Sequence, residues 1–162
     1  MSELKTNAMR ILDAMHVPYQ LHTYTPGDSV DGITVAAKMG MDVEKVYKTL
    51  VTQGKGGGFF VFVIPVAQEL DLKKAARAAG EKSVEMIPVK DINRHTGYIR
   101  GGCSPVGMKK KYPIFIEARA QTLPAVVVSG GRIGLQMEIA PEALAQAVGA
   151  QFVSLVRQEG GL

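Results

Sequence analysis

The sequence predicts one α+β domain built around a curved, mixed β-sheet. Its 162 residues match the length of a single domain and are enough to bury a substantial core. Several short runs of β-branched and aromatic residues are separated by glycine- or proline-containing turns, and a few stretches have the apolar spacing of helices. Strands joined by hairpin-like turns, with a smaller number of helices, are typical of the α+β class.

Composition and charge narrow the class of protein. Hydrophobic residues make up 46% of the chain and charged residues 21%, which is ordinary for a globular protein. No apolar run reaches the ~18 residues of a membrane span, and residues 1–5 lack the pattern of a signal peptide, so we expect a cytoplasmic protein with no membrane partner. With one cysteine, Cys103, and three histidines without zinc-ligand spacing, no metal or other cofactor is expected. The net charge of +4 favours a polyanion such as RNA.

Two elements are expected at the N-terminal end. Apolar residues recur at helical spacing over residues 4–15, which predicts an amphipathic helix. Residues 19–24 then alternate as a strand, with Gln20, His22 and Tyr24 on one face. That face either lines a cleft or lies in solvent, and the alternation alone favours the solvated face.

A loop and a short helix are expected next. Residues 25–32 are rich in proline and glycine, and they lie between candidate site elements where they could act as a flap. A helix is expected over residues 33–39, closed by Gly40. Asp42 is expected to cap a second turn that ends at Val46.

One lysine stands at the start of the following strand. Lys48 lies where the chain changes from helix to strand, and this strand is expected to form a hairpin with residues 59–64 through the glycine-rich turn at 53–58. A phosphate-binding loop is excluded, because the turn lacks the Lys-Ser/Thr pair of a Walker motif and leads into a strand. Burial statistics alone favour a solvated role for Lys48 over a catalytic one.

The middle of the chain predicts a capped helix, a short strand and a second helix. Asp71 is expected to cap an alanine-rich helix that ends before Gly80. A short strand is expected at residues 84–87, and Pro88 is expected to begin a helix that reaches His95. No acid is spaced to orient His95 as a general base, so a surface histidine is favoured.

A glycine-rich loop at residues 98–107 is the second candidate site segment. Its glycines leave backbone N–H groups free to face an anion or a carbonyl oxygen. The lysines at 109–111 follow directly, and they either contact a phosphate backbone or form a solvated surface.

The C-terminal third is expected to add strands and one helix. Gly130 and Gly131 are expected to turn one strand into the next, and Pro141 is expected to open a helix. The expected strands cover residues 113–117, 125–129, 133–139 and 152–156, and the expected helix covers residues 141–148.

Six short motifs occur in an order that is hard to obtain by accident. They are Tyr-Lys-Thr-Leu at 47–50, Leu-Asp-Leu-Lys-Lys at 70–74, Val-Glu-Met at 84–86, Thr-Gly-Tyr at 96–98, Gly-Gly-Cys-Ser-Pro-Val-Gly at 101–107 and Val-Ser-Gly-Gly at 128–131. Together they resemble the YbaK/EbsC family of aminoacyl-tRNA deacylases, and more narrowly its YbaK branch, which clears cysteine mischarged onto proline tRNA. The resemblance runs from about residue 20 to the C-terminus.

The resemblance implies a fold, an activity and partners. The fold would be a single domain over residues 1–162 with a barrel-like mixed sheet flanked by helices. The activity would be trans-editing of Cys-tRNA(Pro), with Cys-tRNA(Cys) as a further substrate, and prolyl-tRNA synthetase would be a candidate partner. No cofactor is implied.

The resemblance also implies site residues. Lys48, Tyr24, Gly101 and Ser129 match positions that it gives as catalytic, and Gly102, Ser104, Pro105, Gly130 and Gln136 match substrate-binding positions. The chain departs from the family at one of them, because Gln136 stands where an aspartate is expected. A neutral amide forms hydrogen bonds but cannot pair as a charge with Lys48 or with the ammonium of the substrate.

The residues themselves do not predict a conventional hydrolytic triad. Cys103 has no base paired with it by spacing, and neither Ser104 nor Ser129 lies in a Gly-x-Ser-x-Gly motif. An aminoacyl ester is already activated, so positioning and stabilisation of the carbonyl oxygen can suffice. The resemblance implies that the thiol of the substrate cysteine attacks its own carbonyl. The alternatives are a non-catalytic module that binds tRNA or a synthetase, and a protein that binds a small molecule in the same cleft.

Overall fold

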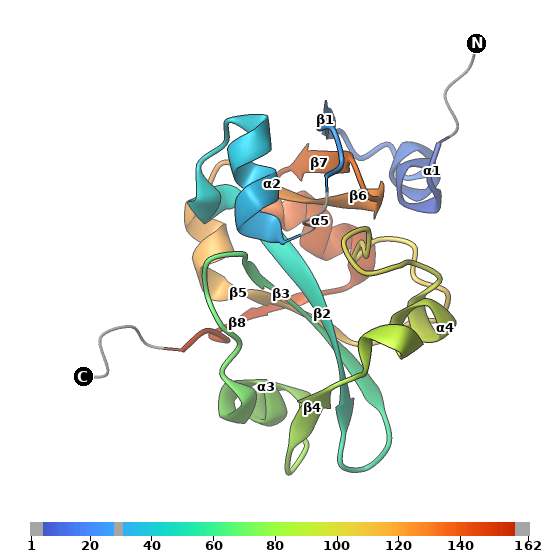
Figure 1. Cartoon of the computed structure of the whole chain (residues 1–162). Coiled ribbons are helices and arrows are strands. Elements are labelled where there is room, and N and C mark those ends of the chain that lie inside the picture. Colours follow the sequence, from blue (N-terminus) through green and yellow to red (C-terminus); the bar gives the residue numbers. More distant parts are fainter. Residues whose placement is uncertain (1–4, 28–30, 158–162) are drawn as a thin grey trace.

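The computed structural model describes residues 5–27 and 31–157, and its strands form two sheets (Figure 1). The smaller sheet contains β1 (Gln20–Thr23), β6 (Val126–Arg132) and β7 (Leu135–Ile139), in the order β1-β7-β6, and all its pairs are antiparallel. The larger sheet contains β2 (Tyr47–Gly54), β3 (Phe59–Pro65), β4 (Val84–Met86), β5 (Ile114–Glu117) and β8 (Gln151–Val153), in the order β4-β2-β3-β5-β8. In it, β2 is antiparallel to β3 and β4, whereas β5 is parallel to β3 and β8.

The α+β class and the mixed pairing are confirmed, but the expectation of one barrel-like sheet is wrong. The two sheets do not close into a barrel. Their backbone pairing in the described part of the chain consists of one isolated parallel bridge between Val46 and Val127. A barrel requires a continuous ladder of strand pairs, and a single bridge leaves the strands of the two sheets free to diverge.

The helices begin and end largely where the capping residues predict. They are α1 (Asn7–Ala14), α2 (Gly32–Met39), α3 (Leu72–Ala79), α4 (Ile92–Thr96) and α5 (Pro141–Val148), with 3-10 turns η1 (Val43–Lys45), η2 (Val89–Asp91) and η3 (Ala118–Thr122). Asp71 accepts hydrogen bonds from the first amides of α3, and Asp42 caps η1. Gly40 ends α2 in the left-handed conformation that glycine adopts without strain.

Two local expectations differ from the structure. Gly130 and Gly131 do not form the turn after Ser129; β6 continues through them to Arg132, with an irregular register. Gly131 has a φ of 106°, so it forms a bulge within the strand instead of reversing the chain. After Pro88 the chain first makes the 3-10 turn η2, and α4 begins only at Ile92.

The main core lies between the two sheets, and a second core lies under α3. The main core combines Leu12 of α1, Met137 of β7 and Val61 of β3, all with no more than traces of exposed surface. The second core packs Ala75 of α3 against Phe62 on the opposite face of the larger sheet. The arrangement in Figure 1 therefore places the start of β2 beside both the smaller sheet and α2.

An ion-pair cluster also holds the two sheets together. The carboxylate of Glu138 on β7 lies 2.8 Å from His22 Nε2 on β1 and 2.7 Å from Lys45 Nζ at the end of η1. Hydrogen bonds from Lys45 and then His22 hold the pKa of the Glu138 carboxyl below its ordinary value. Because η1 leads directly into β2, this cluster fixes the start of β2 against the smaller sheet.

Candidate functional site

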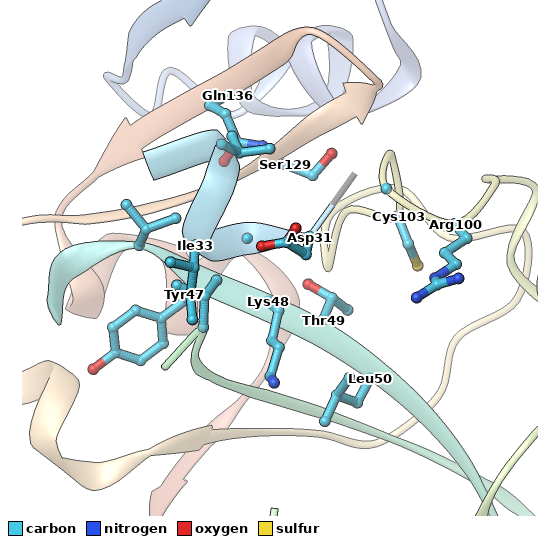
Figure 2. Close-up of a pocket in the computed structure, with 15 residues that line it drawn as sticks. Asp31, Ile33, Tyr47, Lys48, Thr49, Leu50, Arg100, Cys103, Ser129 and Gln136 are labelled. Carbon is cyan, nitrogen blue, oxygen red and sulfur yellow. The ribbon is translucent and has the colours of Figure 1, made fainter. Parts of the chain in front are cut away.

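A pocket of about 330 Å³ opens where the start of β2, the beginning of α2 and the loop around Gly101 meet (Figure 2). The smaller sheet closes its far side through Ser129 and Gln136, which lie opposite each other in the β6–β7 register. The residues that line the pocket are Asp31, Gly32, Ile33, Val35, Val46, Tyr47, Lys48, Thr49, Leu50, Val66, Arg100, Gly101, Cys103, Ser129 and Gln136.

Three buried valines form one apolar wall of the pocket. Val35 comes from α2, Val46 precedes β2, and Val66 follows β3, and each is more than nine-tenths buried. Their packing excludes water from one side of the pocket, which strengthens any polar interaction made beside them.

Three residues that line this pocket have a buried polar side-chain atom without a hydrogen-bond partner among the described residues: Tyr47, Thr49 and Gln136. Thr49 Oγ1 and Gln136 Oε1 are inaccessible and unpaired within residues 5–27 and 31–157. Leaving a buried polar atom unpaired costs about 1–3 kcal/mol, so native proteins rarely keep such atoms without a ligand or water to satisfy them. Thr49 Oγ1 and Gln136 Oε1 therefore each mark a place for a polar ligand group, and the group at Gln136 Oε1 must donate, because an amide oxygen only accepts.

Ser129 adds a hydroxyl beside Gln136, its partner in the β6–β7 register. Its Oγ accepts a hydrogen bond from the backbone N–H of Gly131 at 3.2 Å, and its side chain is mostly buried. A hydroxyl that accepts one bond still has its own proton to donate. Ser129 can thus donate to a carbonyl oxygen while Gln136 and Thr49 accept from a neighbouring group.

Lys48 lines the pocket but directs its ammonium group elsewhere. Strand alternation places Lys48 and Leu50 on the face of β2 opposite to Thr49, and Figure 2 shows the Lys48 side chain directed away from Ser129 and Gln136. Burial lowers its pKa, and the charge of Glu69 opposes this shift. Its amine makes no hydrogen bond or ion pair with another described residue. Lys48 is thus a half-buried cation at the rim of the pocket.

Cys103 does not have the environment of a nucleophile. Burial raises the pKa of its thiol to about 11, although a hydrogen bond with the Thr96 side chain opposes the shift. The thiol is therefore protonated at neutral pH, and a protonated thiol is a poor nucleophile. None of the three histidines lines the pocket, so no imidazole is placed to remove the proton.

The predicted site residues fall into two structural groups. Lys48, Gly101, Ser129 and Gln136 come together around the pocket, although they lie far apart in the sequence. The remaining predicted residues do not line it: these are Tyr24, Gly102, Ser104, Pro105 and Gly130.

Packing inside the protein explains why residues of the second group do not face the pocket. A Cβ at Gly102 would lie 2.9 Å from the Cα of Arg132, so this glycine allows the loop to touch the β6–β7 turn. The Ser104 hydroxyl is buried and accepts a hydrogen bond from the amide of Val106. Tyr24 differs, because its buried hydroxyl is unpaired within the described residues.

Comparison with known proteins identifies the family of the chain. A family model described as "Aminoacyl-tRNA editing domain" matches residues 30–147. The chain belongs to this family.

Similar proteins match nearly the whole chain. The Enterococcus faecalis protein named "Putative Cys-tRNA(Pro)/Cys-tRNA(Cys) deacylase EbsC" is 45% identical over 159 residues, which cover 98% of this chain and 97% of that protein. A structure titled "Crystal structure of a putative trans-editing enzyme for prolyl tRNA synthetase" is 25% identical, has a TM-score of 0.79, and is matched over 96% of this chain and 100% of that one. The hypothetical protein APE2540, at 22% identity and a TM-score of 0.86, shares the fold over 93% of this chain and 99% of its own.

The sequence did not single out several residues of the editing-domain pocket. Thr49 lies in the Tyr-Lys-Thr-Leu motif and Arg100 precedes Gly101, so proximity to a motif was an available signal for both. Asp31 and Ile33 carry no such signal, and they reach the pocket only because α2 lies over the start of β2. The Asp31 carboxylate caps α2 by accepting hydrogen bonds from the Thr34 amide and hydroxyl.

Residues 5–27 and 31–157 contain no group of three or more histidine, cysteine, aspartate or glutamate side chains arranged to hold a metal ion. In the same ranges, no helix has both the length and the apolar character needed to cross a membrane.

Proposed function

We propose that this protein is a trans-acting deacylase that cleaves the aminoacyl ester of Cys-tRNA(Pro), with Cys-tRNA(Cys) as a further substrate. The observation that carries the proposal is the pocket with unpaired buried acceptors and no nucleophile–base pair. Membership of the editing-domain family and 45% identity to EbsC over nearly its full length support it. We propose a cytoplasmic location and prolyl-tRNA synthetase as a partner on the same grounds.

The proposed chemistry uses the substrate's own thiol. Its sulfur attacks the ester carbonyl, a carbon–sulfur bond forms, and the bond from the carbonyl carbon to the ribose oxygen breaks. The thiol proton passes to the ribose oxygen, so the products are free tRNA and a cyclic thioester. The reaction needs no nucleophile from the protein, which agrees with the protonated, buried thiol of Cys103.

Each pocket residue has a distinct proposed role. The backbone of Gly101 and the hydroxyl of Ser129 stabilise the carbonyl oxygen as negative charge develops on it. Thr49 and Gln136 accept hydrogen bonds from the α-ammonium group of the substrate. Lys48 contacts the terminal nucleotide at the rim, because its ammonium points away from the acceptors.

The other predicted residues serve the pocket less directly. We propose that Tyr24 acts from beside the pocket, where its buried hydroxyl has no partner among the described residues. Gly102, Ser104, Pro105 and Gly130 fix the position of the loop and strand that carry Gly101 and Ser129.

Thiol-dependent chemistry also provides specificity. A pocket that distinguishes small side chains by fit alone gains only ~1–3 kcal/mol per group. If the thiol itself reacts, serine and alanine esters lack an equivalent nucleophile. Ser-tRNA(Pro) and Ala-tRNA(Pro) should therefore be cleaved far more slowly than Cys-tRNA(Pro), and equal rates on all three would refute the thiol route.

The deciding experiment measures release of cysteine from Cys-tRNA(Pro) by the parent and by Lys48→Ala. Loss of the rim cation should lower kcat/KM by on the order of 10²-fold. Lys55→Ala is the matched control, since Lys55 is an exposed lysine at the tip of the β2–β3 hairpin. If the parent protein releases no cysteine above the buffer rate, the proposed deacylase activity is refuted. The alternative of a non-catalytic tRNA-binding module would then be favoured.

A further inference from the structure

One loop carries both a wall of the pocket and the longest basic run in the chain. We call residues 97–112 the recognition loop. Its first part contributes Arg100, Gly101 and Cys103 to the pocket. Its last part carries Lys109, Lys110 and Lys111, and all three are exposed.

Hydrogen bonds within the loop hold its two parts at a fixed separation. The Tyr98 hydroxyl donates to the carbonyl of Val106 at 2.6 Å, which joins the two parts directly. The amide of Lys109 donates to the carbonyl of Thr96 at 2.8 Å, which returns the basic run to the end of α4. These bonds tie the backbone at the start of the basic run to the same segment that carries the pocket wall.

Contacts to other elements hold the loop against the rest of the molecule. The Asn7 side chain of α1 donates to the carbonyl of Gly107 at 2.9 Å. Gly102 packs directly against the backbone of Arg132 at the β6–β7 turn. The recognition loop is thus held in place by α1 at Gly107 and by the β6–β7 turn at Gly102.

The charges on this loop are not neutralised by the protein. Arg100, Lys109, Lys110 and Lys111 form no ion pair with the carboxylates of residues 5–27 and 31–157. The amine of Lys109 reaches only the backbone carbonyl of Arg94, at 3.4 Å. Adjacent cations repel one another, and the binding of a polyanion removes this repulsion while releasing counterions.

We propose that Lys109–Lys111 bind phosphates of the RNA strand that leads to the aminoacylated end, while Arg100 and Gly101 of the same loop contact that end. This inference rests on the proposed function. RNA is favoured over an acidic protein because the neighbouring pocket would take the aminoacyl ester, and the nucleotides before that ester necessarily carry phosphates. Lysine ammonium groups bind phosphates as point charges without reading the base sequence.

The test compares two substrates with the same ester. One is Cys-tRNA(Pro), and the other is the cysteinyl ester of adenosine, which has no phosphate. In Lys109→Gln/Lys110→Gln/Lys111→Gln, KM for the tRNA should rise about tenfold, and the dependence of log KM on log salt should become shallower by about 0.7 for each lost phosphate contact. The kcat at saturating tRNA and the kcat/KM for the adenosine ester should change less than about twofold.

A matched variant separates a local contact from a general effect of charge. Lys73→Gln/Arg77→Gln/Lys82→Gln removes the same charge from exposed residues of α3 and the turn after it. It should leave KM for the tRNA within about twofold of the parent. An equal rise in KM for both triple variants, or an equal loss on both substrates, would overturn the inference.

Binding of uncharged proline tRNA tests the RNA surface even if the parent protein has no catalytic activity. The parent should bind this tRNA about tenfold more tightly than the Lys109–Lys111 triple variant, with circular dichroism confirming that both are folded. An inactive parent that shows this difference would refute the proposed deacylase and support the RNA surface. Equal binding by the two proteins would refute the surface, whatever the activity.

Discussion

Cys103 and Thr49 both line the pocket, but their polar atoms have different environments. The sulfur of Cys103 is protonated and packs in the core, whereas Thr49 Oγ1 is buried without a partner. The thiol of Cys103 is intrinsically more reactive than the hydroxyl of Thr49, but it is held in its unreactive, protonated form. A hydroxyl that seeks a partner is suited to holding a substrate, and a neutral buried thiol is suited to packing.

We expect Cys103→Ala to keep most of the deacylase activity. Removal of the sulfur leaves a small cavity, which should lower the free energy of unfolding by about 1 kcal/mol, but it removes no reacting group. The kcat on Cys-tRNA(Pro) should fall less than about threefold. A fall as deep as that of Lys48→Ala, with an intact circular dichroism spectrum, would identify the thiol as a catalytic group.

Substitution of Gln136 by aspartate tests whether the pocket needs a negative charge at this position. We expect Gln136→Asp to lower KM for Cys-tRNA(Pro) about fivefold, because a charged acceptor strengthens a hydrogen bond to ammonium by ~1 kcal/mol. Gln136→Asn is the control, because it shortens the side chain equally without adding charge. Identical kinetics for the parent and Gln136→Asp would remove any role for this position.

At the scale of elements, capping residues were predictable and strand pairing was less so. Asp71 and Gly80 delimit α3 as expected, because the cap hydrogen bonds form between near neighbours in the chain. The turn assigned to Gly130 and Gly131 was wrong, because glycine permits a bulge as readily as a reversal. The pairing of β6 with β7 decides between these two uses, and the glycines alone do not specify its register.

The same limit applies to the site. Lys48 and Gly101 belong to motifs that the sequence displays, and the structure places both at the pocket. Gly102 belongs to the same motif yet faces the backbone of Arg132, a contact that no local pattern reveals. Motifs therefore indicated the segments of the site, and tertiary packing decided which side chains in them face the pocket.

Gly102→Ala should displace the recognition loop as a unit. The new methyl group would meet the Arg132 Cα at 2.9 Å, and backbone cannot yield as a flexible side chain does. We expect the free energy of unfolding to fall by about 1–3 kcal/mol and kcat/KM for Cys-tRNA(Pro) to fall at least tenfold. Gly58→Ala, where the nearest atoms are 3.7 Å away, should change neither quantity appreciably. Chemical denaturation and initial rates provide the measurements, and parent-like values for Gly102→Ala would contradict the tight packing.

For the whole molecule, the division into two sheets makes the ion-pair cluster of His22, Lys45 and Glu138 structurally important. It joins the smaller sheet to the beginning of β2, next to the one backbone bridge that residues 5–27 and 31–157 form between the sheets. The sequence did not reveal this cluster, because His22 and Glu138 lie 116 positions apart. Long-range pairing of this kind also explains why the division into two sheets was not predicted.

The cluster predicts a pH-dependent contribution to stability. The pKa of Glu138 is lowered in the folded protein, so its ionised form contributes stability that is present above the unfolded-state pKa and is lost as the pH falls through the folded-state pKa. Glu138→Gln should lower the free energy of unfolding by about 1–3 kcal/mol at neutral pH. The difference from the parent should shrink below the ordinary glutamate value of 4.5.

Urea denaturation across this pH range provides the measurement for Glu138. Glu85→Gln is the control, since Glu85 is exposed on β4 and makes no ion pair with a described residue. A difference between the parent and Glu138→Gln that stays constant down to acidic pH would show that the carboxylate charge does not stabilise the fold.

The pairing of β1 with β7 has a consequence for synthesis of the chain. The N-terminal strand emerges from the ribosome early, but its only partner strand in the described structure, β7, ends at Ile139. Until β7 is made, Leu21 and its neighbours have no ladder to join, and the pocket lacks Gln136. Contacts so distant in sequence form late and slowly. A nascent chain that stops before β7 therefore contains Lys48 and Ser129 but not the complete pocket, which forms only after β7 has been made.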